Sequence, residues 1–227
     1  MLFFDSHLHN KGKESGGFII GTEGKLPPPP NFKILTNTEV LALQDVSKNY
    51  YSFYYVQISE LNKIIQHPYL KYHPRRENYK IQEVNDHIKI CQPSAVIVDT
   101  LNEPYWKPQD YWKLAAENAQ IPFVFAHAGG YAINEFLKIC NFQKNVWIDF
   151  SFTHTFFKCY GENESSGLPY VKQAIYYALH SSFKNRILFG TDYPFIDQSE
   201  VVKFYEKYLD LLNENFLNLV EVIKCQN

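Results

Sequence analysis

Two histidines near the start of the chain are separated by one residue and follow an apolar run. His7 and His9 lie shortly after the apolar residues 2–4 in the segment MLFFDSHLH. In an extended strand, side chains i and i+2 point to the same face, so both imidazoles are directed at one point. The spacing is typical of a metal-ligand pair, but a surface pair at a strand end has the same spacing. The remaining sequence has to distinguish the two.

Imidazole and carboxylate groups also follow later apolar runs. They are His73 in KYHPRREN, Asp99 in VIVDTLNEP, His127 in VFAHAGG, Asp149 in WIDFS and Asp192 in LFGTDYPF. Backbone structure alone could also explain such residues at these positions. His127 and Asp192 fit turns, and His73 precedes a proline, which favours extended backbone. Taken together, these groups match a site for a borderline metal such as Zn²⁺ with an open position for water.

The elements that must position these groups follow from the hydrophobic pattern. Apolar runs predict strands at 2–7, 17–21, 53–58, 69–73, 95–100, 122–127, 146–151 and 186–192. Helical patterns lie between or after them at 37–49, 58–66, 80–92, 109–120, 132–142, 170–183 and 199–216. Continuous apolar runs are typical of parallel strands buried on both faces, and their alternation with helices indicates βαβ units.

The expected fold is an α/β protein, a distorted (β/α)8 TIM barrel that forms one domain over residues 1–227. Eight strands match this fold, in which catalytic groups collect at the C-terminal ends of the strands. The distortion is expected because no helical pattern separates the first two strands. A doubly wound open sheet is the alternative, but no glycine-rich phosphate loop follows the first strand.

Composition excludes several classes of function. The net charge is −2, so nucleic acid and anionic membranes are not expected partners. No apolar run approaches the ~20 residues that span a bilayer, and no leader pattern is present. Cys91, Cys140, Cys159 and Cys225 show no CxxC spacing and are expected to be reduced thiols of a cytoplasmic protein. The expected partner is a small-molecule substrate, and a homo-oligomer remains possible.

The motifs DSHLH, KYHPRREN, PFVFAHAGG, NVWIDFS and RILFGTDYP resemble the amidohydrolase superfamily, over residues 2 to about 196. They are most similar to the branch with the aminocarboxymuconate-semialdehyde and resorcylate decarboxylases. The resemblance implies a distorted TIM barrel with one or two metal ions. His7 and His9 match the first-strand ligands, and Asp192 matches the last-strand aspartate that binds metal or handles a proton. His127 matches a histidine that often polarises or protonates substrate.

The chain departs from this family at the end of the fifth strand, where a histidine ligand is common. Asp99 or Thr100 stands there. Asp99 could substitute, His73 could reach in from the fourth strand, His127 could bind the ion, or metal affinity could be low. No carboxylated-lysine bridge is evident, because Lys71 is a weaker candidate than His73. We therefore expect one divalent ion, zinc, held by His7, His9, His73 and Asp192.

The implied activity is hydrolysis of a C–N or C–O bond in a small carboxylate-bearing molecule by metal-activated water. Asp192 would accept the proton of the water, and His127 would stabilise the oxyanion or protonate the leaving group. Arg75 is expected to bind a carboxylate, whereas Arg76 is expected to be a solvated loop charge. Aromatic side chains expected at the pocket are Tyr79, Tyr105 and Trp106. A decarboxylase on the same scaffold and a non-catalytic binding barrel are the alternatives.

Overall fold

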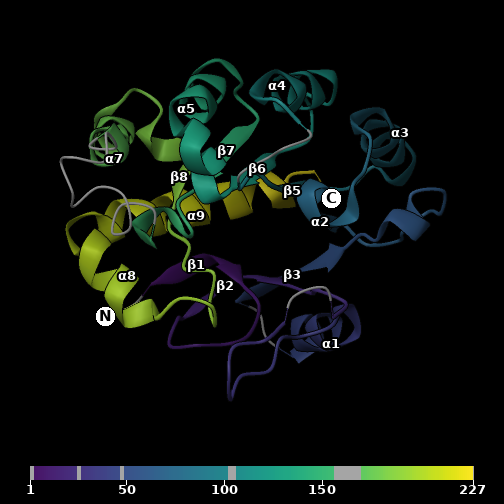
Figure 1. The fold of residues 1–227 in the computed structure, drawn as a ribbon, viewed down its shortest axis with the longest axis horizontal. Coiled ribbons are helices and arrows are strands. Elements are labelled where there is room, and N and C mark those ends of the chain that lie inside the picture. The colour runs from purple at the N-terminus through teal and green to yellow at the C-terminus, as the bar shows by residue number, and fades with distance from the viewer. Residues whose placement is uncertain (1–2, 25–26, 47–48, 102–105, 156–169, 227) are drawn as a thin grey trace.

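Eight parallel strands in sequence order form the centre of the protein, seen here in a computed structural model (Figure 1). The structure describes residues 1–227 except 1–2, 25–26, 47–48, 102–105, 156–169 and 227. The strands are β1 (Phe4–Leu8), β2 (Gly16–Ile20), β3 (Tyr50–Tyr55), β4 (Tyr69–Tyr72), β5 (Ala95–Asp99), β6 (Phe123–Ala126), β7 (Val146–Asp149) and β8 (Ile187–Leu188). This is a distorted TIM barrel, as the sequence predicts.

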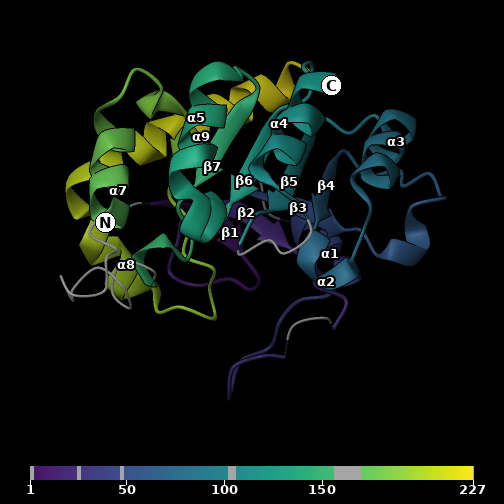
Figure 2. The same cartoon turned by 45° about the horizontal axis from the view of Figure 1, so that its top comes forward.

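Helices surround the strands (Figure 2). The helices among the described residues are α1 (Asn37–Val46), α2 (Pro74–Glu77), α3 (Ile81–Cys91), α4 (Pro108–Glu117), α5 (Ile133–Phe142), α7 (Tyr170–His180), α8 (Gln198–Tyr205) and α9 (Leu209–Lys224). Residues 9–15, between β1 and β2, contain no helix, which confirms the expected irregularity. Within the described part of the chain, no helix is both long and apolar enough to cross a membrane.

The barrel closes between β1 and the segment after β8. The amide of Ser6 donates to the carbonyl oxygen of Phe189 at 2.8 Å, and the amide of Asp192 donates to that of His7 at 2.9 Å. The amide of His9 then donates to the carbonyl oxygen of Tyr193 at 2.8 Å. These parallel contacts bring the C-terminal ends of the first and last strands together, so His7 and Asp192 become neighbours.

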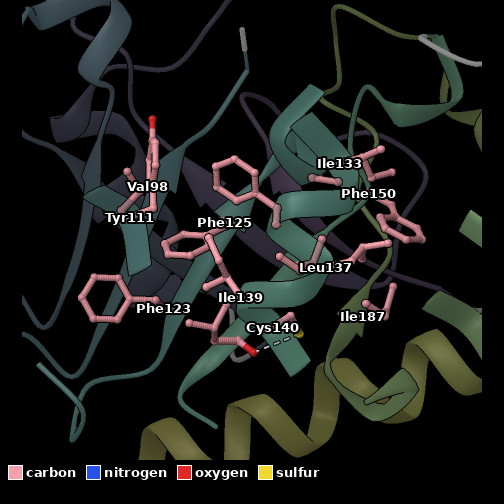
Figure 3. Close-up of a cluster of buried hydrophobic side chains, with 14 of the residues drawn as sticks. Val98, Tyr111, Phe123, Phe125, Ile133, Leu137, Ile139, Cys140, Phe150 and Ile187 are labelled. Carbon is pink, nitrogen blue, oxygen red and sulfur yellow. Dashed lines mark hydrogen bonds between the residues drawn. The ribbon is translucent and has the colours of Figure 1, made fainter. Parts of the chain in front are cut away.

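Alternate residues of each strand face opposite layers of the core. Val98, Phe123 and Phe125 point outward and pack against α4 and α5 in a large apolar cluster (Figure 3). Ile97 and Val124 belong to a separate cluster with the apolar face of α9, which includes Phe216, Leu219, Val220 and Ile223. The period of two therefore divides each strand into a helix-facing set and a set that faces the barrel interior. Asp99, two residues after Ile97, continues the interior set.

Several element boundaries differ from the sequence prediction. The strand expected at 53–58 lies at Tyr50–Tyr55, because tyrosines at its start continue the pairing with β2. The helix expected at 58–66 is a single 3-10 turn, Ile58–Glu60, in which the Glu60 carboxylate accepts the amide of Gln57 at 2.9 Å. The helix expected at 199–216 is divided into α8 and α9 by a 3-10 turn, Glu206–Tyr208. The short helix α2 follows His73 and was not expected.

Candidate active site

A cavity of about 210 Å³ lies at the C-terminal ends of the strands. Most of the groups that the sequence places at strand ends contribute to its wall. The described lining residues are His7, His9, Tyr55, Lys71, His73, Arg75, Arg76, Asp99, Leu101, His127, Phe152, Asp192 and Phe195. The polar groups therefore converge on one cavity at the mouth of the barrel, which is the expected place for a TIM-barrel active site.

His7 is oriented by a buried carboxylate on a distant strand. Its Nδ1 donates to Oδ2 of Asp149 at 2.9 Å, and both side chains are buried. Burial lowers the pKa of His7 well below its usual value, so the ring is neutral. Burial also raises the pKa of Asp149 to about 6, which leaves this carboxylate ionised at neutral pH. The Nε2 lone pair of His7 then faces Oδ1 of Asp192 at 3.5 Å.

His9 has the same arrangement through a backbone partner. Its Nδ1 lies 3.2 Å from the carbonyl oxygen of Ile20 and donates to it. Its Nε2 lies 3.4 Å from Oδ1 of Asp192. Two imidazole nitrogens and one carboxylate oxygen, all acceptors when the rings are neutral, thus face one another. Such a set is stable when a proton or a cation lies between its members.

The chemistry of these donors fits a divalent ion. His7, His127 and Asp192 each offer one ligand atom, and the three atoms lie within 4.8 Å of one another. Imidazole nitrogen and carboxylate oxygen are zinc ligands, with bond lengths of about 2.0–2.2 Å. His9 is not one of these three residues, although its Nε2 lies 3.4 Å from Oδ1 of Asp192. Second partners on Nδ1 of His7 and His9 are what metal-binding histidines normally have.

His127 is held at both ring nitrogens. Its Nε2 lies 3.1 Å from Oδ2 of Asp99, and its Nδ1 lies 2.8 Å from Oγ of Ser151. Burial opposes protonation, but the carboxylates of Asp99 and Asp192 together outweigh it, so the pKa of His127 is raised. His127 can bind an ion only by exchanging one of these contacts, and its present partners suit a group that carries a proton.

The backbone at this position is unusual. His127 and Ala128 have φ of 65° and 50°, and Asp192 has φ of 66°. Non-glycine residues rarely adopt this left-handed region, and such outliers concentrate at functional sites. Gly129, with φ of 78°, follows directly, and a Cβ there would lie 2.1 Å from Cδ2 of Phe136. The glycine of HAGG therefore allows the tight turn that presents His127 to the cavity.

His73 lies apart from the possible metal ligands. Its Nε2 is 3.3 Å from Oδ2 of Asp99 and accepts the Nε–H of Arg76 at 3.1 Å. His73 is not in the group of three ligand atoms formed by His7, His127 and Asp192. Asp99, which stands where the family commonly has a histidine, instead contacts both His73 and His127. Arg76 was expected to be a solvated loop charge; the residue is exposed, but it also lines the cavity and contacts His73.

The residues expected to bind substrate fall into two groups. Arg75 lines the cavity. Tyr79 and Trp106 are 2% and 4% exposed, belong to the apolar core and are absent from the described cavity wall. Trp106 Nε1 donates to the carbonyl oxygen of Tyr79 at 3.0 Å, and the Tyr79 hydroxyl donates to that of Val56. We therefore do not retain Tyr79 and Trp106 as substrate contacts. Tyr105 and Cys159 lie outside the described residues.

Three supporting residues have contacts that the sequence did not predict. Asp149 orients His7, and Lys71 lines the cavity. Asp5 is fully buried and accepts the amides of His7 and Thr191, both at 3.0 Å, so it ties the first strand to the turn before Asp192. One feature of the sequence is common to all three. Each is an ionisable residue in an apolar strand, and it lies two positions from an apolar residue or a histidine whose side chain faces the barrel interior.

The fold and the site define this protein as a TIM barrel with an imidazole–carboxylate cluster at the mouth of the barrel. The sequence model of the amidohydrolase family matches residues 79–217, and the chain belongs to this family. No curated protein sequence matches the chain.

Solved structures with the same fold share little sequence. An uncharacterised TIM-barrel protein from Bordetella bronchiseptica has a TM-score of 0.66 at 13% identity, covering 93% of this chain and 78% of that one. A probable 2-pyrone-4,6-dicarboxylic acid hydrolase from Acinetobacter baumannii, with citric acid bound, has a TM-score of 0.60 at 14% identity over 99% and 100%. An amidohydrolase from Burkholderia multivorans, with bound zinc, has a TM-score of 0.58 at 12% identity over 92% and 92%.

Proposed function

We propose that this protein is a metal-dependent hydrolase that cleaves a C–N or C–O bond in a small carboxylate-bearing molecule. The observation that carries the proposal is the convergence of three buried side chains, His7, His127 and Asp192, in one cavity. Membership of the amidohydrolase family is consistent with this activity. The zinc in the Burkholderia multivorans amidohydrolase supports zinc as the ion.

One divalent ion would be held by Nε2 of His7, Nε2 of His9 and the carboxylate of Asp192. When bound, such an ion polarises a carbonyl and lowers the pKa of water. The bonds from Nδ1 of His7 and His9 to Asp149 and to the Ile20 carbonyl orient both rings and place the proton of each neutral ring on Nδ1. His127 lies close to the same position, where it acts on the substrate and not as a ligand of the ion.

The protein groups divide the proton transfers between them. The water oxygen forms a bond to the carbonyl carbon while Asp192 accepts a proton from the water. His127 donates the proton that the leaving nitrogen or oxygen needs when its bond to carbon breaks. Asp99 stabilises the charged form of His127 before this transfer, because its carboxylate lies 3.1 Å from Nε2. A wall of buried side chains limits bulk water at these atoms.

Arg75 supports a carboxylate-bearing substrate. Its guanidinium is at the cavity wall, and a guanidinium can bind a carboxylate through two parallel hydrogen bonds. Neutral amides and lactones of the same shape should therefore be poorer substrates than their acidic counterparts.

The test is elemental analysis of protein purified without chelators, followed by a panel of acidic lactones, amides and carboxylic acids. We expect about one zinc per chain, hydrolysis of a lactone or amide, and loss of activity on chelation with recovery on adding zinc. Glu221→Gln changes an exposed residue on α9, and this control variant should match the wild type in zinc content and activity. Release of CO₂ without hydrolysis would replace the proposal with a decarboxylase. If folded wild-type protein contains no metal, a non-catalytic binding barrel would be favoured.

A further inference from the structure

Lys71 is a buried cation in the interior of the barrel. It lies on β4 in the phase of Tyr69, whose side chain belongs to the interior cluster, while Leu70 and Tyr72 face the helices. The lysine is 1% exposed, and its Nζ has no hydrogen-bond partner among the described residues. A buried ammonium without a partner is costly, because it loses hydration and gains nothing in return.

A second unpartnered donor belongs to the same cavity. Nε of Arg75 is buried and has no partner in the described structure. Both side chains line the cavity, and the nearby charge of Arg75 is one of the causes that lower the pKa of Lys71, after burial as the largest. Two cationic donors that face one cavity without acceptors indicate that the acceptors come from a bound molecule.

The charges on the described cavity wall also favour an anion. Lys71, Arg75 and Arg76 contribute three cations, against the carboxylates of Asp99 and Asp192. Both carboxylates attract the charge of Lys71, yet neither lies within hydrogen-bond distance of Nζ. A divalent ion would add further positive charge. The cavity therefore has unpaired donors and an excess of positive charge, and both favour a negatively charged ligand.

We propose that Lys71 remains an unmodified ammonium and, together with Arg75, binds the anionic oxygens of a carboxylate-bearing ligand in this cavity. The identification of that ligand as the substrate rests on the proposed function. Lys71 is thereby a substrate-binding residue rather than a bridging metal ligand, and the centre holds one ion.

Calorimetric titration of the zinc-loaded protein with succinate tests this inference, with neutral succinamide as the matched probe. Lys71→Met removes the charge and keeps most of the apolar stem of the side chain, and Arg75→Met removes the guanidinium at the second donor. Lys138→Met on the exposed side of α5 is the control. We expect each of Lys71→Met and Arg75→Met to weaken succinate binding at least tenfold, with zinc content unchanged and succinamide binding unaffected.

Two further measurements separate binding from a structural role. Because Lys71→Met removes an unpaired buried charge, its unfolding midpoint should equal or exceed that of the wild type. Wild-type protein incubated with ¹³C-bicarbonate should show no carbamate signal. A carbamate on Lys71, loss of a second ion in Lys71→Met, or succinate affinity that is independent of Lys71 would overturn the proposal. So would a wild type that binds succinate no better than succinamide.

The outcomes also distinguish this inference from the proposed function. Protein without metal that still binds succinate through Lys71 would contradict metal-dependent hydrolysis and leave the inference standing. If the protein holds one zinc but binds succinate independently of Lys71, the inference would be contradicted and metal-dependent hydrolysis would stand.

Discussion

His7 donates a hydrogen bond through Nδ1 to Oδ2 of Asp149 at 2.9 Å, which links β1 to β7 inside the barrel. The two residues are 142 positions apart in the chain. The contact fixes the tautomer of His7 and leaves Nε2 as its free ligand atom.

Asp149→Asn should weaken zinc binding by about 10- to 100-fold, the usual effect of losing a partner behind a metal-binding histidine. The carboxylate accepts both the Ser151 amide and His7 Nδ1, through different oxygens. An asparagine has one acceptor oxygen and cannot satisfy both donors. Competition with a zinc chelator measures the change, with Asp210→Asn on α9 as the exposed control. Unaltered zinc affinity would show that Asp149 is not needed to orient His7.

Asp192→Asn should lower turnover by at least about 100-fold while zinc content changes by less than about twofold. The amide keeps one coordinating oxygen but cannot accept the proton of the attacking water. Steady-state rates and elemental analysis of the same preparation give both quantities. If the variant loses its zinc completely, Asp192 acts mainly as a ligand and the proton-transfer role lacks support.

His127→Ala should lower turnover by about 10²- to 10⁴-fold with zinc retained, because both ring nitrogens already have protein partners. His73→Ala should also retain zinc. The sequence suggested that His73 binds the ion, but its Nε2 faces Asp99 and Arg76. Zinc stoichiometry and rate are to be measured for both variants. Loss of zinc in His127→Ala alone would make His127 a ligand, and loss in His73→Ala would restore the original assignment.

The unfolding free energy of metal-free protein should report the titration of Asp149. Its folded pKa of about 6 lies above the usual 3.8, because burial disfavours the charge. The folded state therefore binds more protons than the unfolded state between these values, and Asp149 lowers stability as pH rises from about 4 to 6. Relative to the wild type, Asp149→Asn should gain up to about 3 kcal/mol between pH 4 and pH 7. Urea unfolding at both pH values tests this; a constant difference would contradict the raised pKa.

Trp106→Phe should affect stability and not substrate binding. The variant loses the hydrogen bond to the Tyr79 carbonyl, worth about 1 kcal/mol, while keeping most of the buried aromatic surface. Urea unfolding should show this loss, and KM for the best substrate of the panel should stay within about twofold. A large rise in KM with unchanged stability would return Trp106 to the substrate pocket.

The sequence alone was sufficient for the barrel and for most of the polar groups at its mouth. Strand periodicity is local, so alternation places His7 and His9 on one face whatever the rest of the chain does. Apolar runs that alternate with helical patterns also indicate parallel strands and hence a shared C-terminal edge. The match over residues 79–217 confirms the family that the motifs predicted, and it covers the last three of those motifs.

Only the tertiary structure decided which groups meet. The contact between His7 and Asp149 and the position of Asp99 between His73 and His127 depend on barrel closure and side-chain rotamers. Likewise, Trp106 was expected over the pocket but lies in the core, and Lys71 faces the cavity without a partner. Local patterns give the face of a residue, whereas distances between strands far apart in sequence are set by packing of the whole barrel.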